Sequence, residues 1–136
     1  MTESSGERVV VLVVEDDANI RNLLTDVLTE EGYDVVAAAN GGEALGALST
    51  IWPNLMTLDL NLPDLTGEWV LTKLREQAEA RKPPVVVITA KLGIAPEVRK
   101  MADAIVPKPF ELAELLNIIH GFTPPPERAD TSGDSV

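Results

Sequence analysis

The chain has 136 residues, no cysteine and a formal net charge of −11, from 22 acidic and 11 basic residues. This length suits one compact domain, and the lack of cysteine excludes disulfides and thiolate metal sites. The acidic balance argues against direct binding to nucleic acid or an anionic membrane, because both need a basic surface. Residues 1–7 lack a signal-peptide pattern and no apolar run reaches membrane-spanning length, so we expect a cytoplasmic protein.

The first half of the chain alternates strand patterns with helix patterns. Residues 9–14 form a continuous, β-branched apolar run, which is typical of a strand buried on both faces. An amphipathic stripe from Ile20 to Leu28 predicts a helix, with Asp17 as its N-cap and Gly32 as its stop. Three further elements are predicted next: a strand over 33–39, a short helix through 44–48 and a strand over 55–59.

The second half continues the same alternation. After a loop, a helix is expected from Trp69 to near Arg81, where two prolines follow. The remaining predicted elements are a strand over 85–88, a short helix with Pro96 at its first position, a strand over 104–106 and a last helix from 112 that Gly121 ends. Strands that alternate with helices in this way predict right-handed βαβ units, and so an α/β fold with a parallel sheet covered on both faces.

One domain is expected over residues 8–121, between a flexible N-terminus (1–7) and a disordered, proline-rich tail (122–136). The tail has no apolar periodicity, so it cannot bury enough surface to offset the entropy of ordering. A stand-alone domain is expected, and the alternative is that the proline-rich tail begins a linker to a further domain.

Acidic residues and one lysine follow three of the predicted strands. Glu15, Asp16 and Asp17 come after the first strand, Asp59 ends the third, and Lys108 follows the fifth. In an open parallel sheet these positions converge at one edge. Two carboxylates about 4 Å apart repel by roughly 4 kcal/mol at an effective dielectric of about 20, so the cluster needs compensation. Mg²⁺ suits such oxygen ligands, while Asp17 is better explained as a helix cap.

Three neighbouring residues add polar groups to the same edge. The backbone carbonyl or side chain of Asn61 could reach the cation. Lys108 lies between two prolines, outside any helix interior, where its ammonium can act as a point charge on a phosphoryl oxygen. Thr89 places a hydroxyl at the end of the fourth strand. Together these groups indicate a Mg²⁺-dependent phosphoryl-transfer site.

Four segments together resemble the receiver domain of two-component response regulators: 13–17, 58–67, 87–90 and 108–110. They occur in the family's order at nearly its spacings, and the resemblance covers about residues 8–121. It implies a flavodoxin-like, doubly wound, five-stranded parallel sheet with strand order 2-1-3-4-5. It also implies a cis peptide bond between Lys108 and Pro109.

The resemblance implies a role for each residue at the sheet edge. Asp59 would be the phospho-acceptor, Thr89 the switch hydroxyl and Lys108 the phosphoryl-binding lysine. Asn61 and Lys91, two residues beyond Asp59 and Thr89 respectively, are expected to border the phosphoryl group. The metal ligands would be Glu15, Asp16, Asp59 and the backbone of Asn61. The phosphoryl donor would be a histidine kinase or phosphotransfer protein, and the output would pass to an unknown protein target. We expect a monomer that catalyses only its own phosphorylation and dephosphorylation.

Two departures from the family concern the region after Thr89. Ile105 occupies the position, three residues before the lysine, where the family usually has an aromatic ring that reports phosphorylation. The segment between Thr89 and Lys108 is also shorter than expected by about one helical turn, so the fourth helix should be short or irregular. Both changes affect the usual output face and leave the phosphorylation site complete.

Two alternatives remain open. A Mg²⁺-dependent phosphohydrolase of the haloacid dehalogenase type would also use an aspartate nucleophile, but that class has a second aspartate as general acid where this chain has Asn61. A receiver-like interaction module that works without phosphorylation is favoured by the missing aromatic ring and disfavoured by the intact acidic cluster.

Overall fold

The computed structural model describes residues 8–77 and 82–126, and within them five strands alternate with five helices. The strands are β1 (Val10–Val14), β2 (Asp34–Ala38), β3 (Leu55–Leu58), β4 (Val85–Thr89) and β5 (Ala104–Pro107). The helices are α1 (Ala18–Glu30), α2 (Gly41–Leu48), α3 (Gly67–Glu76), α4 (Pro96–Met101) and α5 (Leu112–Phe122). All strand pairs are parallel in the order β2-β1-β3-β4-β5, which confirms the predicted fold class.

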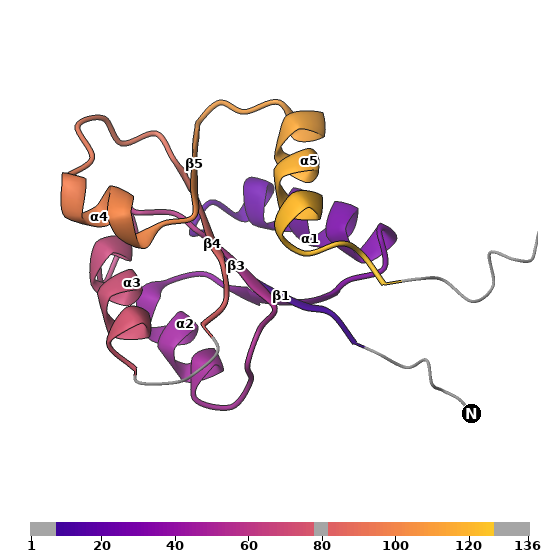
Figure 1. Ribbon diagram of the computed structural model, residues 1–136, viewed down its shortest axis with the longest axis horizontal. Coiled ribbons are helices and arrows are strands. Elements are labelled where there is room, and N and C mark those ends of the chain that lie inside the picture. Colours follow the sequence, from indigo (N-terminus) through magenta and orange to yellow (C-terminus); the bar gives the residue numbers. More distant parts are fainter. Residues whose placement is uncertain (1–7, 78–81, 127–136) are drawn as a thin grey trace, which may run out of the picture.

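The sheet lies between two helical layers, with α1 and α5 on one face and α2, α3 and α4 on the other (Figure 1). Successive residues of a strand pack alternately against the two helical layers. In β1, Val11 and Val13 belong to the core under α1 and α5, whereas Leu12 and Val14 belong to the core under α2, α3 and α4. Because both faces are covered, the inner strands are apolar except for the buried Thr57 and Thr89, as residues 9–14 and 85–88 suggested.

Strand register brings the carboxyl ends of the inner strands to one edge. Val14 pairs with Leu58, so Glu15 and Asp59 leave adjacent strands at the same level. Thr89 pairs with Pro107, which places Lys108 directly after the end of β5. The residues predicted to converge therefore start from the same edge of the sheet.

The helix ends confirm some sequence predictions and correct others. Asp17 caps α1 by accepting from two backbone N–H groups, and Gly32 has a left-handed φ of 105°. α3 was expected to continue to near Arg81, but it ends at Glu76 because Gln77 adopts extended angles (φ −67°, ψ 134°). Residues 78–81 lie outside the described part of the chain.

The fourth helix is short, as predicted. It spans six residues and begins with Pro96 in its first turn. Its N-cap, Ala95, has no side chain that can accept a hydrogen bond from the first turn. α4 is therefore a single short element joined to β4 by the loop of residues 90–95.

The C-terminal boundary differs from the prediction. Gly121 does not end α5, because the only glycines with positive φ in the described residues are Gly32 and Gly93, and the helix continues to Phe122. Thr123 is buried, and its carbonyl accepts a 2.5 Å hydrogen bond from the hydroxyl of Tyr33. Burial raises the pKa of Tyr33 to about 12, so the phenol stays protonated at neutral pH. The packed domain thus extends past residue 121. The predictions of a flexible 1–7 and a disordered 127–136 fall outside the described residues.

Among residues 8–77 and 82–126, no helix has both the length and the apolar character that crossing a bilayer requires.

Candidate functional site

Lys108 forms the centre of the site by binding two buried carboxylates. Its Nζ lies 2.8 Å from Oδ2 of Asp59 and 3.0 Å from Oε1 of Glu15. Glu15 is 2 % exposed and Asp59 is 4 % exposed. Two carboxylates buried this close together would repel each other strongly. The Lys108 ammonium offsets part of this repulsion, which we had expected a metal ion to offset. Three strand ends therefore meet in one hydrogen-bonded group.

The electrostatics of this group follow from burial and pairing. Burial raises the pKa of Glu15 above its ordinary value, although hydrogen bonds from Lys108 and from the N–H of Asp17 act in the opposite direction. Burial alone would lower the pKa of Lys108, but its hydrogen bonds with Asp59 and Glu15 outweigh that effect and raise the pKa. Lys108 is therefore a fixed positive charge at neutral pH.

Glu15, Asp16 and Asp59 form a cluster suited to a hard cation. One carboxylate oxygen from each residue lies within 4.8 Å of the others, and Asp16 is exposed while the other two are buried. This is a set of oxygen donors with one side open to solvent, which fits Mg²⁺ because that ion keeps several of its waters when bound. The three carboxylates named in the predicted ligand set are thus brought together.

The loop after β3 holds Asp59 through its backbone. The N–H of Asn61 donates to Oδ1 of Asp59 over 3.1 Å, while Lys108 occupies Oδ2. The side chain of Asn61 is exposed. The position of Asn61 next to Asp59 agrees with the prediction, and its role as a metal ligand stays a prediction.

Thr89 lies at the same edge but makes no hydrogen bond with the carboxylates of Glu15, Asp16 or Asp59. Its side chain is 2 % exposed, and its Oγ1 accepts from the N–H of Lys91 over 3.1 Å. The carbonyl of Thr89 accepts from the N–H of Lys108 over 3.0 Å, which joins the ends of β4 and β5. The Lys108–Pro109 bond is cis, as the resemblance implied.

The sequence did not predict the contacts of two basic residues near the site. Lys91, two positions after Thr89, was expected to border the phosphoryl group, but its ammonium lies 2.5 Å from Oε2 of Glu68 on α3. Arg21 was not considered, yet its Nη1 donates to the carbonyls of Glu15 and Asp16 over 3.0 and 3.2 Å. Its place in the first turn of the helix that follows the acidic run was the available signal.

The fold and this edge define a class of protein: a parallel α/β domain with a carboxylate cluster and a lysine at the carboxyl ends of β1, β3 and β5. The model of the response regulator receiver domain family matches residues 11–120. The chain belongs to this family, which confirms the resemblance found in the sequence. It is thus the receiver domain of a response regulator, a signalling domain of two-component systems.

Individual relatives support the assignment. The chain is 38% identical over 109 residues to "DNA-binding response regulator MtrA" of Mycolicibacterium paratuberculosis, covering 78% of this chain and 47% of that protein. It is 37% identical over 108 residues to "Probable transcriptional regulator ycf27" of Porphyridium aerugineum, covering 77% of this chain and 44% of the relative. The chain therefore spans less than half the length of these two relatives.

One of the similar solved structures was determined as a complex that contains magnesium. The response regulator TrrA of Thermotoga maritima, in complex with Mg(2+)-BeF, matches with a TM-score of 0.75 and 31% identity. The match covers 84% of this chain and 98% of that one. Receiver domains bind Mg²⁺ through acidic residues, and the cluster of Glu15, Asp16 and Asp59 is such a set.

Proposed function

We propose that Asp59 accepts a phosphoryl group in a Mg²⁺-dependent reaction from a histidine kinase or phosphotransfer protein, and that the domain then signals through protein contacts. The observation that supports this most is the triple arrangement of Lys108, Asp59 and Glu15, with Asp16 completing a cation site. It combines a nucleophile, a fixed positive charge and a set of metal ligands within one edge of the sheet.

In this reaction a carboxylate oxygen of Asp59 forms a bond to phosphorus while the bond from phosphorus to the donor's histidine nitrogen breaks. The nitrogen keeps the electron pair of that bond, and the product is an aspartyl phosphate. The Lys108 ammonium, already 2.8 Å from Asp59, pairs with a phosphoryl oxygen. A bound Mg²⁺ would neutralise charge on the phosphoryl oxygens, held by Glu15, Asp16 and Asp59 and by the backbone of Asn61.

Thr89 is proposed as the hydroxyl that responds to the new phosphoryl group. It is buried at the same edge and is tied through its carbonyl to Lys108. A donor hydroxyl next to three new phosphoryl oxygens gains a charge-assisted hydrogen bond, so the loop after β4 would be drawn toward Asp59.

Incubation with acetyl phosphate and Mg²⁺ tests the nucleophile. We expect intact-mass spectrometry to show one added phosphoryl group, none on Asp59→Asn, and a rate at least about tenfold lower for Lys108→Ala. Asp26→Asn is the matched control, because Asp26 is an exposed carboxylate on α1, away from the sheet edge. Phosphorylation of Asp59→Asn at the parent rate would show that another residue is the acceptor.

Thermal unfolding with Mg²⁺ tests the cation site separately. A ligand at about ten times its dissociation constant stabilises the folded state by about 1.4 kcal/mol, so Mg²⁺ should raise the melting temperature of the parent. Asp16→Asn should weaken this increase, whereas Asp26→Asn should not. A melting temperature that ignores Mg²⁺ in the parent would contradict the metal site.

The phosphohydrolase alternative predicts turnover of a generic phosphate ester such as p-nitrophenyl phosphate. Asn61 disfavours this alternative, because its backbone N–H donates a hydrogen bond to Asp59 and its side chain cannot act as a general acid. Multiple turnovers that depend on Asp59 would favour it over the receiver function. An interaction module that works without phosphorylation would show no added mass in the acetyl phosphate experiment.

We also propose that a kinase or phosphotransfer protein is the phosphoryl donor, that the target is a protein and that the domain is a monomer. MtrA is named DNA-binding, but the matched part is 47% of that protein. The net charge of −11 disfavours nucleic acid as a direct ligand of this chain.

A further inference from the structure

Arg21 lies in the first turn of α1, shortly after the acidic residues that follow β1. Its side chain is half-buried and reaches back to the end of that strand. There Nη1 donates to the carbonyl of Glu15 over 3.0 Å and to the carbonyl of Asp16 over 3.2 Å. The proposed phosphoryl transfer gives this contact no role.

The partners of Arg21 are not the ones that its charge favours. A guanidinium binds a carboxylate well, because the two groups form parallel, charge-assisted hydrogen bonds. In the part of the chain that the structure describes, Arg21 nevertheless forms no ion pair with Glu15, Asp16 or Asp17. Asp17 caps α1, and Glu15 binds Lys108. The guanidinium therefore holds the backbone of the loop and leaves the carboxylates to other partners.

The two carbonyls lie on either side of the Cα atom of Asp16. The carbonyl of Glu15 belongs to the peptide group before that atom, and the carbonyl of Asp16 belongs to the peptide group after it. Because each peptide group is planar, holding both of them restricts φ and ψ of Asp16, the only soft backbone dihedrals between them. Arg21 thus fixes the direction in which the Asp16 side chain leaves the loop.

Asp16 is the member of the carboxylate cluster with the fewest restraints of its own. Glu15 and Asp59 both bind Lys108, and each also accepts a hydrogen bond from the backbone N–H two residues further on. The Asp16 side chain is exposed, and its carboxylate makes no hydrogen bond or ion pair within the described residues. Its position in the cluster therefore depends on the backbone that Arg21 holds.

We propose that Arg21 is a positioning residue for Mg²⁺, which orients the Asp16 carboxylate toward Glu15 and Asp59 before the ion binds. This inference rests on the cation site of the proposed function. One carboxylate oxygen from each of the three residues already lies within 4.8 Å of the others, so the backbone conformation suits a shared cation. A ligand that is ordered in advance does not lose that freedom when the ion binds.

A charge effect and a positioning effect of Arg21 have opposite signs. A guanidinium near a cation site repels the ion, so a purely electrostatic role would make Mg²⁺ bind more tightly to Arg21→Ala. A positioning role makes Mg²⁺ bind more weakly to the same variant, because Asp16 must then be ordered by the ion. Loss of a group that orients metal ligands typically weakens binding by about 10- to 100-fold.

A Mg²⁺ titration of the full ¹⁵N-labelled chain measures the affinity at the amides of Asp16 and Asn61. Arg21→Ala should raise the dissociation constant about tenfold. Arg21→Lys should recover part of this loss, since an ammonium can still donate to one of the carbonyls. Arg21 is only half-buried and alanine favours helices, so Arg21→Ala should fold.

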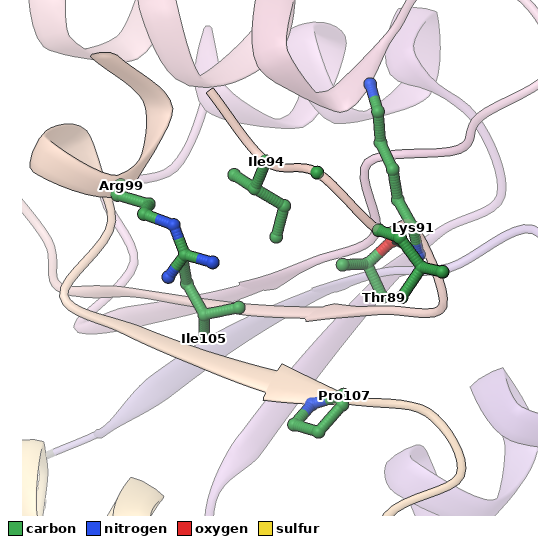
Figure 2. A pocket seen from close by; sticks show the side chains of 8 residues that line it. Thr89, Lys91, Ile94, Arg99, Ile105 and Pro107 are labelled. Carbon is green, nitrogen blue, oxygen red and sulfur yellow. Dashed lines mark hydrogen bonds between the residues drawn. The ribbon is translucent and has the colours of Figure 1, made fainter. Parts of the chain in front are cut away.

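Arg99→Ala is the matched control for charge. It removes the same charge from an exposed side chain of α4, which extends toward Ile105 (Figure 2). α4 covers the opposite face of the sheet from α1 (Figure 1). This variant should leave the Mg²⁺ dissociation constant unchanged.

A measurement without Mg²⁺ separates this inference from the metal site itself. In ¹⁵N relaxation of the metal-free protein, the order parameter of the Asp16 amide should fall from about 0.85 in the parent to about 0.6 in Arg21→Ala, and that of Asn61 should stay unchanged. If the parent amides do not respond to Mg²⁺, the cation site of the proposed function is wrong, whereas the relaxation data still report whether Arg21 orders the loop.

Two results would overturn the inference. Tighter or unchanged Mg²⁺ binding to Arg21→Ala, in a parent that binds the ion, would show that the guanidinium does not position Asp16. Equal order parameters of the Asp16 amide in the two proteins would show that the loop keeps its conformation without Arg21.

Discussion

The two loops that flank Asp59 and Thr89 are held in place by different means. In the β3–α3 loop, Gly67 packs so closely that a Cβ there would lie 2.3 Å from the carbonyl oxygen of Asp59. The N–H of Gly67 also donates to Leu60 over 2.9 Å, and Thr66 caps α3. Asp64 reaches across to bind the N–H groups of Gly41 and Gly42 at the start of α2.

The β4–α4 loop has few such anchors. Leu92 is 89 % exposed, and Gly93 has a left-handed φ of 66° with no atom within 4 Å of where a Cβ would be. Ala95 leaves α4 without a side-chain cap. The loop is attached through the hydrogen bond from Lys91 to Thr89, the Lys91–Glu68 ion pair and the packing of the half-buried Ile94 against the core.

The different anchoring of the two loops suits two different roles. The loop that carries Asp59 is fixed by packing, so Asp59 keeps its position beside Lys108 and Glu15. The loop beside Thr89 is held by backbone conformation and few contacts, of which only Ile94 reaches the core, and this places the loop at the low end of local stability. The response to a phosphoryl group should therefore appear in the β4–α4 loop.

The largest effect is expected for Gly67→Ala. The added methyl group meets backbone atoms of Asp59 and Leu60 that cannot rotate away, so unfolding free energy should fall by about 3 kcal/mol or more. Urea denaturation measures this loss. Gly46→Ala is the matched control, because no atom lies within 4 Å of its Cβ position in α2, and it should stabilise by roughly 0.5–1 kcal/mol.

Gly93→Ala should have a smaller effect. Space is open around Gly93, so only the left-handed conformation opposes the substitution, at a cost of about 1–2 kcal/mol in unfolding free energy. The rate of phosphorylation by acetyl phosphate should be unchanged. A loss of stability as large as that of Gly67→Ala would show that both loops are held by packing and would break the comparison.

Ala95→Ser should stabilise the protein by roughly 0.5–1 kcal/mol. Ala95 already has the extended conformation of an N-cap (φ −62°, ψ 147°), so a hydroxyl there can accept from the first turn of α4. Hydrogen exchange of the α4 amides should slow in the same variant. Unchanged exchange would mean that the end of α4 does not limit the mobility of this region.

The smallest effect concerns the pH dependence of the β3–α3 loop. Hydrogen bonds from the N–H groups of Gly42 and Gly41 lower the pKa of the exposed Asp64. A carboxylate with a lowered folded pKa stabilises the protein above its unfolded pKa of about 3.9, and this contribution is lost as pH falls through the folded value.

Melting temperatures of the parent and of Asp64→Asn test this sign. The parent should melt at a higher temperature than Asp64→Asn at neutral pH, and the difference should begin to shrink near pH 4 and disappear below the lowered folded pKa of Asp64. Asp26→Asn should show no such pH-dependent difference. A difference that persists in acid would indicate that shape, and not charge, links Asp64 to α2.

Much of the fold was predictable because the signals are local. The apolar runs at 9–14 and 85–88 and the stripe from Ile20 to Leu28 report burial directly, and Asp17 at the start of that helix reports a cap. The convergence of Glu15, Asp16, Asp59 and Lys108 followed from one rule about the carboxyl ends of parallel strands.

The rest depends on contacts between distant parts of the chain. Tyr33 and Thr123 are 90 positions apart, so nothing in the tail itself predicted that Thr123 is buried. Spacing alone predicted only that Lys91 lies near the expected phosphoryl group, and it could not predict the pairing of Lys91 with Glu68, 23 positions away. The sequence also could not predict that Lys108 reaches both carboxylates, since this needs the strand register.

The bond between Tyr33 and Thr123 also sets the distance between Asp59, the proposed phospho-acceptor, and the point where the chain leaves the packed domain. The Thr123 hydroxyl donates to the carbonyl of Asn54, which directly precedes β3, while Asp59 directly follows that strand. At about 3.3 Å per residue, the two ends of this segment are roughly 16 Å apart. Residues 124–126 are thus attached at the end of β3 opposite to Asp59, and a change at Asp59 would reach them along the sheet or through α5.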